Sequence, residues 1–155
     1  MGQRLVKDFM VTAVVTLFPE DRIERAVATL LEHQVGGAPV VDAQGRLVGL
    51  LSDRDLLVRQ GRIHVPTIFT IFSEHGRGFP PPSLEAFVTA LHKALGTTVG
   101  EVMDPNPPTC TEEETAEDVA TRMLDHDASR LPVVRDGILV GIVARGDLLR
   151  LLGAG

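Results

Sequence analysis

Apolar and polar positions follow two different periods along the first third of the chain. Residues 23–31 carry apolar side chains at helical spacing, which predicts an amphipathic helix. A short apolar stretch at 13–18 precedes this helix and is expected to form a strand. β-Branched runs at 38–41 and 47–51 flank a polar, glycine-containing turn, a pattern typical of a β-hairpin. A second helix is expected near 53–59.

The same order of elements occurs a second time. An offset of 93 residues brings Met10 onto Met103, and an offset of 92, after one residue is lost in a turn, brings Gly49 onto Gly141. The second copy predicts a hairpin and a following helix, at 131–134, 139–143 and 145–152. Each half therefore reads as β-α-β-β-α, an α+β unit that cannot bury its sheet face alone. We expect the halves to pack with pseudo-twofold symmetry into one globule with a cleft on the axis.

The helix starts are less well defined than the helices. Asp21 and Glu24 have the spacing of a capping pair, and so do Thr111 and Glu114. The repeat, however, aligns Glu114 with Asp21, so one of the two cap assignments is expected to be misplaced.

Each half resembles a CBS domain, and the two together resemble a Bateman module. The resemblance rests on HQVGGAPVVD at 33–42 and GRLVGLLSDRDL at 45–56, and on SRLPVV at 129–134 and GILVGIVARGDL at 137–148. It divides the chain into a first repeat (1–60), an insert (61–96) and a second repeat (97–155).

The resemblance implies a sensor of adenosine ligands, namely AMP, ADP, ATP or S-adenosylmethionine, held in the cleft between the repeats. Family members carry ribose and phosphate contacts on a Gly-h-h-Ser/Thr-x-x-Asp segment, where h is apolar, and residues 49–55 match it. Asp55 would accept hydrogen bonds from the ribose diol, since a carboxylate can accept both hydroxyl hydrogens. Ser52, at the start of the following helix, would donate to a phosphate, and Arg54 is a further candidate phosphate ligand.

The second copy departs from this motif. It keeps Asp147 as a candidate ribose ligand but has Ala144 in place of the hydroxyl, so a second site would be weaker or empty. Arg130 stands where family members often place a phosphate-binding basic residue, whereas Gly37 holds that place in the first copy. Arg145 is a weaker candidate, because an exposed arginine is more often a solvated surface charge.

Each of these residues also has a purely structural interpretation. Ser52 and Asp55 have the spacing of a helix cap, which is a common arrangement. Asp147 persists although Ala144 lacks a hydroxyl, and this favours a ligand role over a capping pair. His33 and His126 occupy equivalent helix ends, where the helix dipole favours a partly positive ring.

The insert contains four of the six phenylalanines and a Pro80-Pro81-Pro82 run. After Ser83, a stripe of apolar residues at helical spacing predicts an amphipathic helix: Leu84, Phe87, Val88, Leu91 and Leu95. This helix is expected either to pack on the chain's own core or to contribute to a homodimer interface.

Composition narrows the function classes. The 155 residues include 15 basic and 21 acidic side chains, a net charge of −6, which argues against a dedicated nucleic-acid binder. The single cysteine, Cys110, excludes disulfide frameworks and thiolate zinc sites, suits a reducing cytoplasm, and is expected in the core or an edge strand. No apolar stretch approaches a membrane span. The acidic run at 112–118 is expected to be a solvated helix start rather than a metal site.

No catalytic constellation is present, so we expect a regulatory protein rather than an enzyme. The interpretation favoured is a stand-alone module that binds an adenosine ligand, requires no cofactor, and signals through conformation or assembly to an effector in another chain. The alternatives are a ligand-free interaction module and a regulatory fragment of a larger enzyme or transporter.

Overall fold

The computed structural model describes residues 3–52, 55 and 98–153 and divides the chain into two compact units. One unit, here the α2 unit, is made from residues 15–42 and 48–105, and the other, the α7 unit, from residues 1–14, 43–47 and 106–155. The predicted helix of the insert lies outside the described residues.

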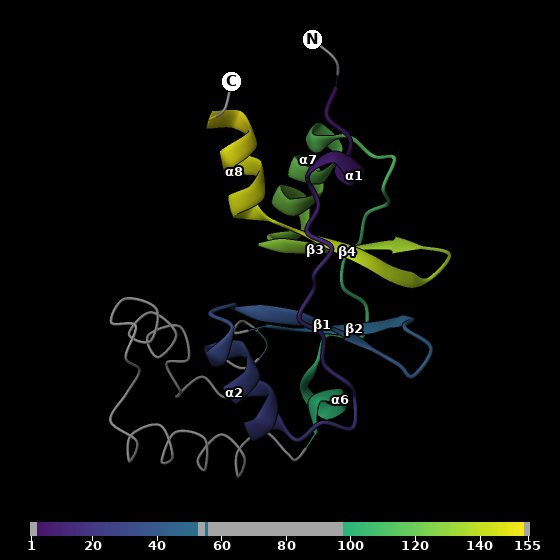
Figure 1. The fold of residues 1–155 in the computed structure, drawn as a ribbon, viewed down its shortest axis with the longest axis vertical. Coiled ribbons are helices and arrows are strands. Elements are labelled where there is room, and N and C mark those ends of the chain that lie inside the picture. The colour runs from purple at the N-terminus through teal and green to yellow at the C-terminus, as the bar shows by residue number, and fades with distance from the viewer. Residues whose placement is uncertain (1–2, 53–54, 56–97, 154–155) are drawn as a thin grey trace. The chain divides into compact units, whose positions relative to one another are not determined.

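The α2 unit packs helices on one side of a hairpin (Figure 1). Its elements are α2 (Ile23–Glu32), β1 (Gly37–Val41), β2 (Leu47–Ser52) and the short α6 (Val99–Val102). The predicted helix and hairpin are confirmed. All four elements contribute to one apolar core, whose members include Ile23, Val27, Leu30, Val40, Leu51, Val99 and Val102.

The α7 unit repeats this plan, and its described residues continue into a helix after the hairpin. The helix expected near 53–59 in the first repeat lies outside the described residues apart from position 55. It contains α1 (Val6–Phe9), α7 (Ala116–His126), β3 (Arg130–Arg135), β4 (Ile138–Ala144) and α8 (Arg145–Gly153). β3 and β4 pair antiparallel, from Arg130 opposite Ala144 to Arg135 opposite Ile138. Its core is formed by Val6, Cys110, Val119, Met123, Leu131, Val133, Val143 and Leu148. The burial of Cys110 confirms the core assignment made from the sequence.

The strand expected at 13–18 is reduced to a single parallel bridge. Leu17 pairs with Val40, through Leu17 N–H to the Pro39 carbonyl at 3.0 Å and Val41 N–H to the Leu17 carbonyl at 2.9 Å. Continuing this ladder toward Val15 would require an N–H donor at position 39, and proline has none. Cys110 and Val133 form the equivalent bridge after Pro132.

Each unit is completed by a segment from the start of the other sequence repeat. Leu50 of β2 exchanges two backbone hydrogen bonds with Asp104, both 2.9 Å. Ile142 of β4 does the same with Val11, again at 2.9 Å. The packed units therefore do not coincide with the sequence repeats.

Two equivalent glycines allow these segments to approach the hairpins. A Cβ at Gly49 would lie 2.5 Å from the Met103 sulfur and 2.8 Å from the Asp104 carbonyl oxygen. A Cβ at Gly141 would lie 2.8 Å from the Met10 sulfur and 3.0 Å from the Val11 carbonyl oxygen. The repeated Gly and Met residues therefore belong to one contact, made once in each unit.

Both cap assignments made from the sequence are wrong. α2 begins at Ile23 after Arg22, and α7 begins at Ala116 after Thr115, whose hydroxyl caps it. Asp21 and Glu114 instead accept the N–H groups of Phe18 and Thr111, at 2.9 and 2.7 Å. Each of these turns also accepts a hydrogen bond from the segment that begins the other repeat. The Val99 N–H donates to the Asp21 backbone carbonyl and the Val6 N–H to the Glu114 backbone carbonyl, both at 2.8 Å.

The contact at the two glycines predicts a stability cost for one added methyl group. Gly49→Ala is expected to lower the free energy of unfolding by about 1–3 kcal/mol, a cost typical of overpacking, because a backbone carbonyl has to move. Gly141→Ala is expected to act in the same direction with a smaller effect, since its nearest backbone atom is farther away. Urea unfolding followed by circular dichroism measures both values.

Gly153→Ala is the matched control, because a Cβ there meets nothing within 4 Å. It is expected to change stability by less than about 0.5 kcal/mol. Equal stabilities for all three variants would contradict the assigned role of the glycine contacts.

Candidate functional site

The first candidate site lies where β2 ends and the chain turns toward the position of Asp55. The Asp55 carboxylate oxygen Oδ2 accepts from the Ser52 backbone N–H at 2.9 Å and from the Ser52 hydroxyl at 3.2 Å. The structure therefore brings together two of the residues proposed from the sequence. Arg54 lies outside the described residues.

The second candidate site has the same geometry at the junction of β4 and α8. Asp147 Oδ2 accepts from the Ala144 backbone N–H at 2.8 Å, and Asp147 Oδ1 accepts from the Arg150 guanidinium. Arg130 begins β3 directly opposite Ala144, so the register places Arg130 at the same end of the hairpin as Asp147. The candidate residues thus form one group in each unit.

These hydrogen bonds correct one step of the sequence argument. In the sequence, the missing hydroxyl at Ala144 favours a ligand role for Asp147 over a capping pair. Asp147 in fact bonds to the backbone N–H of Ala144, which no side-chain substitution removes. A capping function therefore explains the presence of aspartate in both copies without a ligand.

The junctions retain chemistry suited to a polyol. A carboxylate offers about four lone-pair directions, so an aspartate that holds one or two protein donors can accept further hydroxyl groups.

Two residues near the second junction were not proposed as part of the site from the sequence. Arg150 had a usable signal, its i+3 spacing from Asp147 on one helix face. Ser129, whose carbonyl accepts the Arg145 N–H at 2.8 Å, had none.

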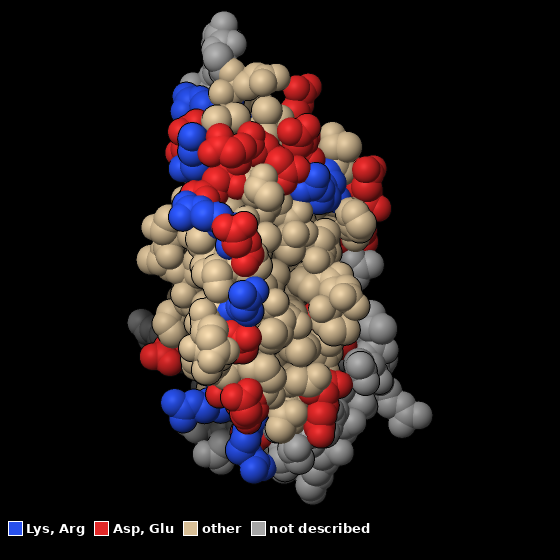
Figure 2. All heavy atoms as spheres, turned by 90° about the vertical axis from the view of Figure 1, so that its right-hand side faces the viewer, with Lys and Arg blue, Asp and Glu red and all other residues tan. Residues whose placement is uncertain are grey.

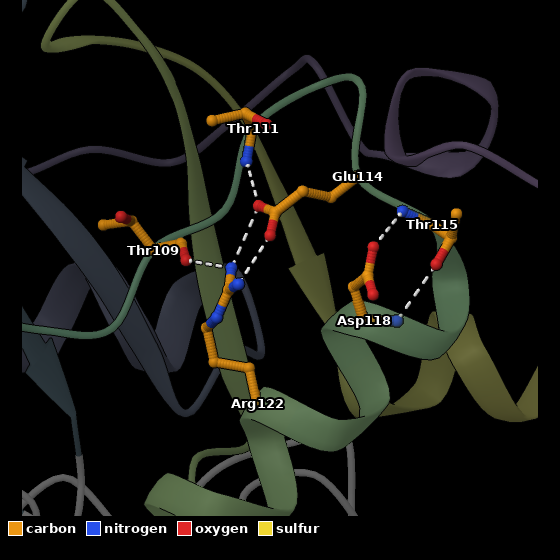
Figure 3. Close-up of polar contacts among 6 residues, drawn as sticks. All are labelled: Thr109, Thr111, Glu114, Thr115, Asp118 and Arg122. Carbon is orange, nitrogen blue, oxygen red and sulfur yellow. Dashed lines mark hydrogen bonds and ion pairs between the residues drawn. The ribbon is translucent and has the colours of Figure 1, made fainter.

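A separate ion pair fixes the chain that enters α7 (Figure 3). Arg122 Nη2 lies 2.5 Å from Glu114 Oε1, and Arg122 Nη1 donates to Glu114 Oε2 at 2.9 Å and to the Thr109 carbonyl at 2.8 Å. The guanidinium and the Thr111 N–H lower the pKa of Glu114, and the carboxylate raises the pKa of Arg122. Figure 3 also shows Asp118, whose pKa is lowered by the backbone and hydroxyl of Thr115.

Cys110 lies beside this ion pair but is chemically inert. Burial raises the pKa of its thiol to about 12, with a further increase from the charge of Glu114. Because the thiolate is the nucleophilic form, a thiol with this pKa is unreactive at neutral pH.

The acidic run at 112–118 is only in part the solvated helix start expected from the sequence, because Glu117 and Asp118 are exposed in the first turn of α7 but residues 112–114 lie before it. Glu112 pairs with Arg135 at 2.6 Å, Glu113 with Lys7 at 3.3 Å, and all three glutamates precede α7. Figure 2 shows acidic and basic side chains interspersed over the α7 unit, in line with this local pairing. In the described ranges, no group of three or more His, Cys, Asp and Glu residues is arranged to hold a metal ion.

Comparison with known proteins identifies the family. The model of the CBS domain matches residues 6–61 and 99–154. The chain therefore belongs to the CBS-domain family and carries two CBS repeats.

The relatives include proteins named for this domain. The chain is 36% identical over 138 residues to the chloroplastic CBS domain-containing protein CBSX1 of Arabidopsis thaliana, covering 85% of this chain and 56% of CBSX1. It is 35% identical over 143 residues to YhcV of Bacillus subtilis, covering 92% of this chain and 81% of YhcV. A relative in Methanocaldococcus jannaschii, 29% identical, is named L-aspartate semialdehyde sulfurtransferase, and the match covers 23% of that protein.

Solved structures share the fold, and some contain adenosine compounds. CBSX2 in complex with AMP has a TM-score of 0.72 and 30% identity, with 97% of each chain covered. The CBS-domain pair of MJ0100 in complex with 5′-methylthioadenosine and S-adenosylmethionine has a TM-score of 0.71 and 26% identity, covering 99% of this chain and 98% of that one. Among the described residues, no helix is both long and apolar enough to cross a bilayer.

The Glu114–Arg122 pair predicts a pH-dependent stability. The pKa of Glu114 is lower in the folded chain than its ordinary value of 4.5, so its carboxylate stabilises the fold above that value. This contribution is lost as the pH falls from 4.5 toward the folded pKa. Glu114→Gln is expected to cost about 1 kcal/mol at pH 7 and progressively less below pH 4.5, as measured by urea unfolding across that range.

Glu113→Gln provides the matched control, because its pair with Lys7 is largely exposed. It is expected to have little effect at any pH. A Glu114→Gln penalty that stays constant through the acid range would show that Glu114 does not act through its charge.

The burial of Cys110 predicts a thiol that reports unfolding. The native protein at pH 8 is expected to react with an aromatic disulfide reagent far more slowly than the protein in guanidinium chloride, because the thiol is both covered and protonated. Absorbance of the released thiolate measures both rates. Similar rates in the two states would contradict the burial of Cys110.

Proposed function

We propose that this chain is a regulatory module that binds an adenosine ligand, AMP, ADP, ATP or S-adenosylmethionine, at its strand-to-helix junctions. The observation that carries the proposal is the pair of junction carboxylates, Asp55 and Asp147, each held by a backbone N–H three residues earlier. Relatives of similar fold and length have been crystallised with AMP and with S-adenosylmethionine.

The polar groups at each junction support specific roles. Asp55 and Asp147 would accept the ribose hydroxyl hydrogens, and Ser52 and Arg130 would donate to phosphate or to another anionic group. Arg54 is proposed beside Ser52 on the sequence motif alone. The sequence contains no Trp or Tyr, so the adenine would contact backbone groups and aliphatic side chains, or one of the six phenylalanines.

A regulatory role requires that binding change something another molecule reads. We propose a change of conformation or assembly, driven by a difference in ligand affinity between two arrangements, with no catalysis by this chain and no required cofactor. We propose in addition that the chain forms a homodimer, with the exposed side chains of Leu124, Leu149 and Leu152, at 82%, 62% and 78%, as candidate contacts. A cytoplasmic location is proposed on the single, buried thiol.

A second candidate function has its own supporting observation. The backbone N–H bonds account for both junction carboxylates without a ligand, which is compatible with a ligand-free interaction module. The proposed function and this candidate differ in whether any adenosine compound binds.

Calorimetric and thermal-shift titrations with AMP, ADP, ATP and S-adenosylmethionine test the proposal. A ligand at 100 times its dissociation constant is expected to stabilise the fold by about 2.7 kcal/mol. Asp55→Asn keeps an acceptor for the Ser52 N–H but removes the charge, and it is expected to weaken binding by about tenfold or more. Asp147→Asn is expected to have a smaller effect, because its junction lacks the hydroxyl.

Asp136→Asn is the matched control, since Asp136 lies in the turn at the opposite end of the β3–β4 hairpin and asparagine tolerates its positive φ of 52°. It is expected to bind as the wild type does. Absence of binding by all four ligands would favour the interaction module. Equal losses in Asp55→Asn and Asp136→Asn would overturn the site assignment.

A further inference from the structure

One methionine in each unit lies over the glycine where the segment from the other repeat meets the hairpin. A Cβ at Gly49 would lie 2.5 Å from the Met103 sulfur and 3.1 Å from Met103 Cγ. A Cβ at Gly141 would lie 2.8 Å from the Met10 sulfur and 3.2 Å from Met10 Cγ. In each unit, therefore, the thioether fills the space that a side chain on the strand would take.

The backbone pairing of each segment begins at the residue after its methionine. Asp104 exchanges two hydrogen bonds with Leu50, and Val11 exchanges two with Ile142, all at 2.9 Å. The methionine side chain thus lies between segment and strand at the point where their backbones meet. A change in its polarity or size acts directly on this pairing.

The described methionines differ in how far they are covered. Met10 and Met103 are half-buried and pack at the edge of an apolar core. Met123 belongs to the core of the α7 unit and is only 4% exposed. A thioether needs no deprotonation to be oxidised, so its rate of oxidation depends on whether the oxidant can reach the sulfur.

We propose that Met10 and Met103 are sites of reversible oxidation by hydrogen peroxide, and that the sulfoxide weakens the pairing between segment and hairpin in its unit. The sulfur attacks one peroxide oxygen, an S–O bond forms as the O–O bond breaks, and the other oxygen leaves with both hydrogens as water. The sulfur loses two electrons to the peroxide. A sulfoxide reductase reverses the step, with two thiols oxidised to a disulfide and the oxygen released as water.

The oxidised side chain no longer suits this contact. The sulfoxide adds a polar oxygen to a sulfur that already fills the space over a glycine. A covered polar atom without a hydrogen-bond donor is unfavourable, and turning the oxygen toward water withdraws the sulfur from the glycine. The packing of the segment on the strand is lost in either case, whether or not the chain binds an adenosine ligand.

The first test maps oxidation in the full chain. The protein is treated with hydrogen peroxide, and the sulfoxide at each methionine is quantified by peptide mass spectrometry. In the native protein, Met10 and Met103 are expected to oxidise several-fold faster than Met123, because the Met123 side chain is covered. In guanidinium chloride the three rates are expected to converge.

Amide hydrogen exchange followed by NMR shows where oxidation acts. Exchange in the oxidised protein is expected to be at least about fivefold faster at the four amides of the segment pairing, which are Leu50, Asp104, Val11 and Ile142. The Val41 and Val134 amides are the controls, since they donate to Leu17 and Cys110 at 2.9 Å, away from the two glycines. They are expected to change less.

Leucine variants connect the modification to stability. Oxidation of the wild type is expected to lower its melting temperature by about 2–12 °C, and a sulfoxide reductase with dithiothreitol is expected to restore it. The double variant Met10→Leu/Met103→Leu keeps apolar side chains of similar volume and is expected to lose this response. Met123→Leu is the matched control and is expected to keep it.

Three results would overturn the proposal. The first is oxidation of Met10 and Met103 no faster than that of Met123 in the native protein. The second is their oxidation without faster exchange of the four pairing amides. The third is a fall in melting temperature that persists in the folded double variant or that the reductase does not reverse. The first two are measured on the wild type, so they decide the proposal even if the double variant does not fold.

Discussion

The rest of the structure depends on one constraint. The edge of each hairpin pairs through its backbone with a segment from the other repeat, here called the exchanged segment. In both units a strand residue, Leu50 or Ile142, exchanges two hydrogen bonds with a segment from the start of the other repeat. Such pairing satisfies N–H and C=O groups at an edge that would otherwise remain open. It also carries Val99 and Val102, or Val6, into the apolar core. The glycine at the contact, the methionine over it and the turn carbonyl that receives the segment all follow from this one approach.

The exchange explains why the repeat in the sequence and the packed unit in space differ. A fragment cut at the repeat boundary would keep its helix and hairpin but would lack the segment that completes its core. The pairing also joins residues far apart along the chain, Val11 with Ile142, so its loop-closure entropy has to be met late in folding. Local elements can form first, but each unit is complete only when the segment from the other repeat is in place.

The sequence predicted the elements whose signal is local. Helix α2 and both hairpins were found because apolar periodicity and turn residues lie within ten or so positions of one another. The strand at 13–18 was overestimated, because the missing N–H of Pro39 stops its ladder after Leu17. The helix-capping roles predicted for Asp21 and Glu114 are wrong. Both side chains bond within a turn whose backbone carbonyl accepts a hydrogen bond from a segment distant in the sequence. Arg122 was missed because its partner Glu114 lies eight positions away, across an irregular stretch.

Residues that are identical in the two repeats have structural roles in both units. Gly49 and Gly141 are identical because a close backbone approach requires it, and Asp55 and Asp147 because each holds a backbone N–H. Identity between the repeats therefore marks shared structural demands, and a ligand is not needed to account for it. The candidate ligand positions differ between the repeats: Ser52 stands against Ala144, and Gly37 against Arg130. If the two junctions bind adenosine ligands unequally, these differing pairs are the expected cause, because both junctions share the glycine contact and the backbone N–H that holds the aspartate.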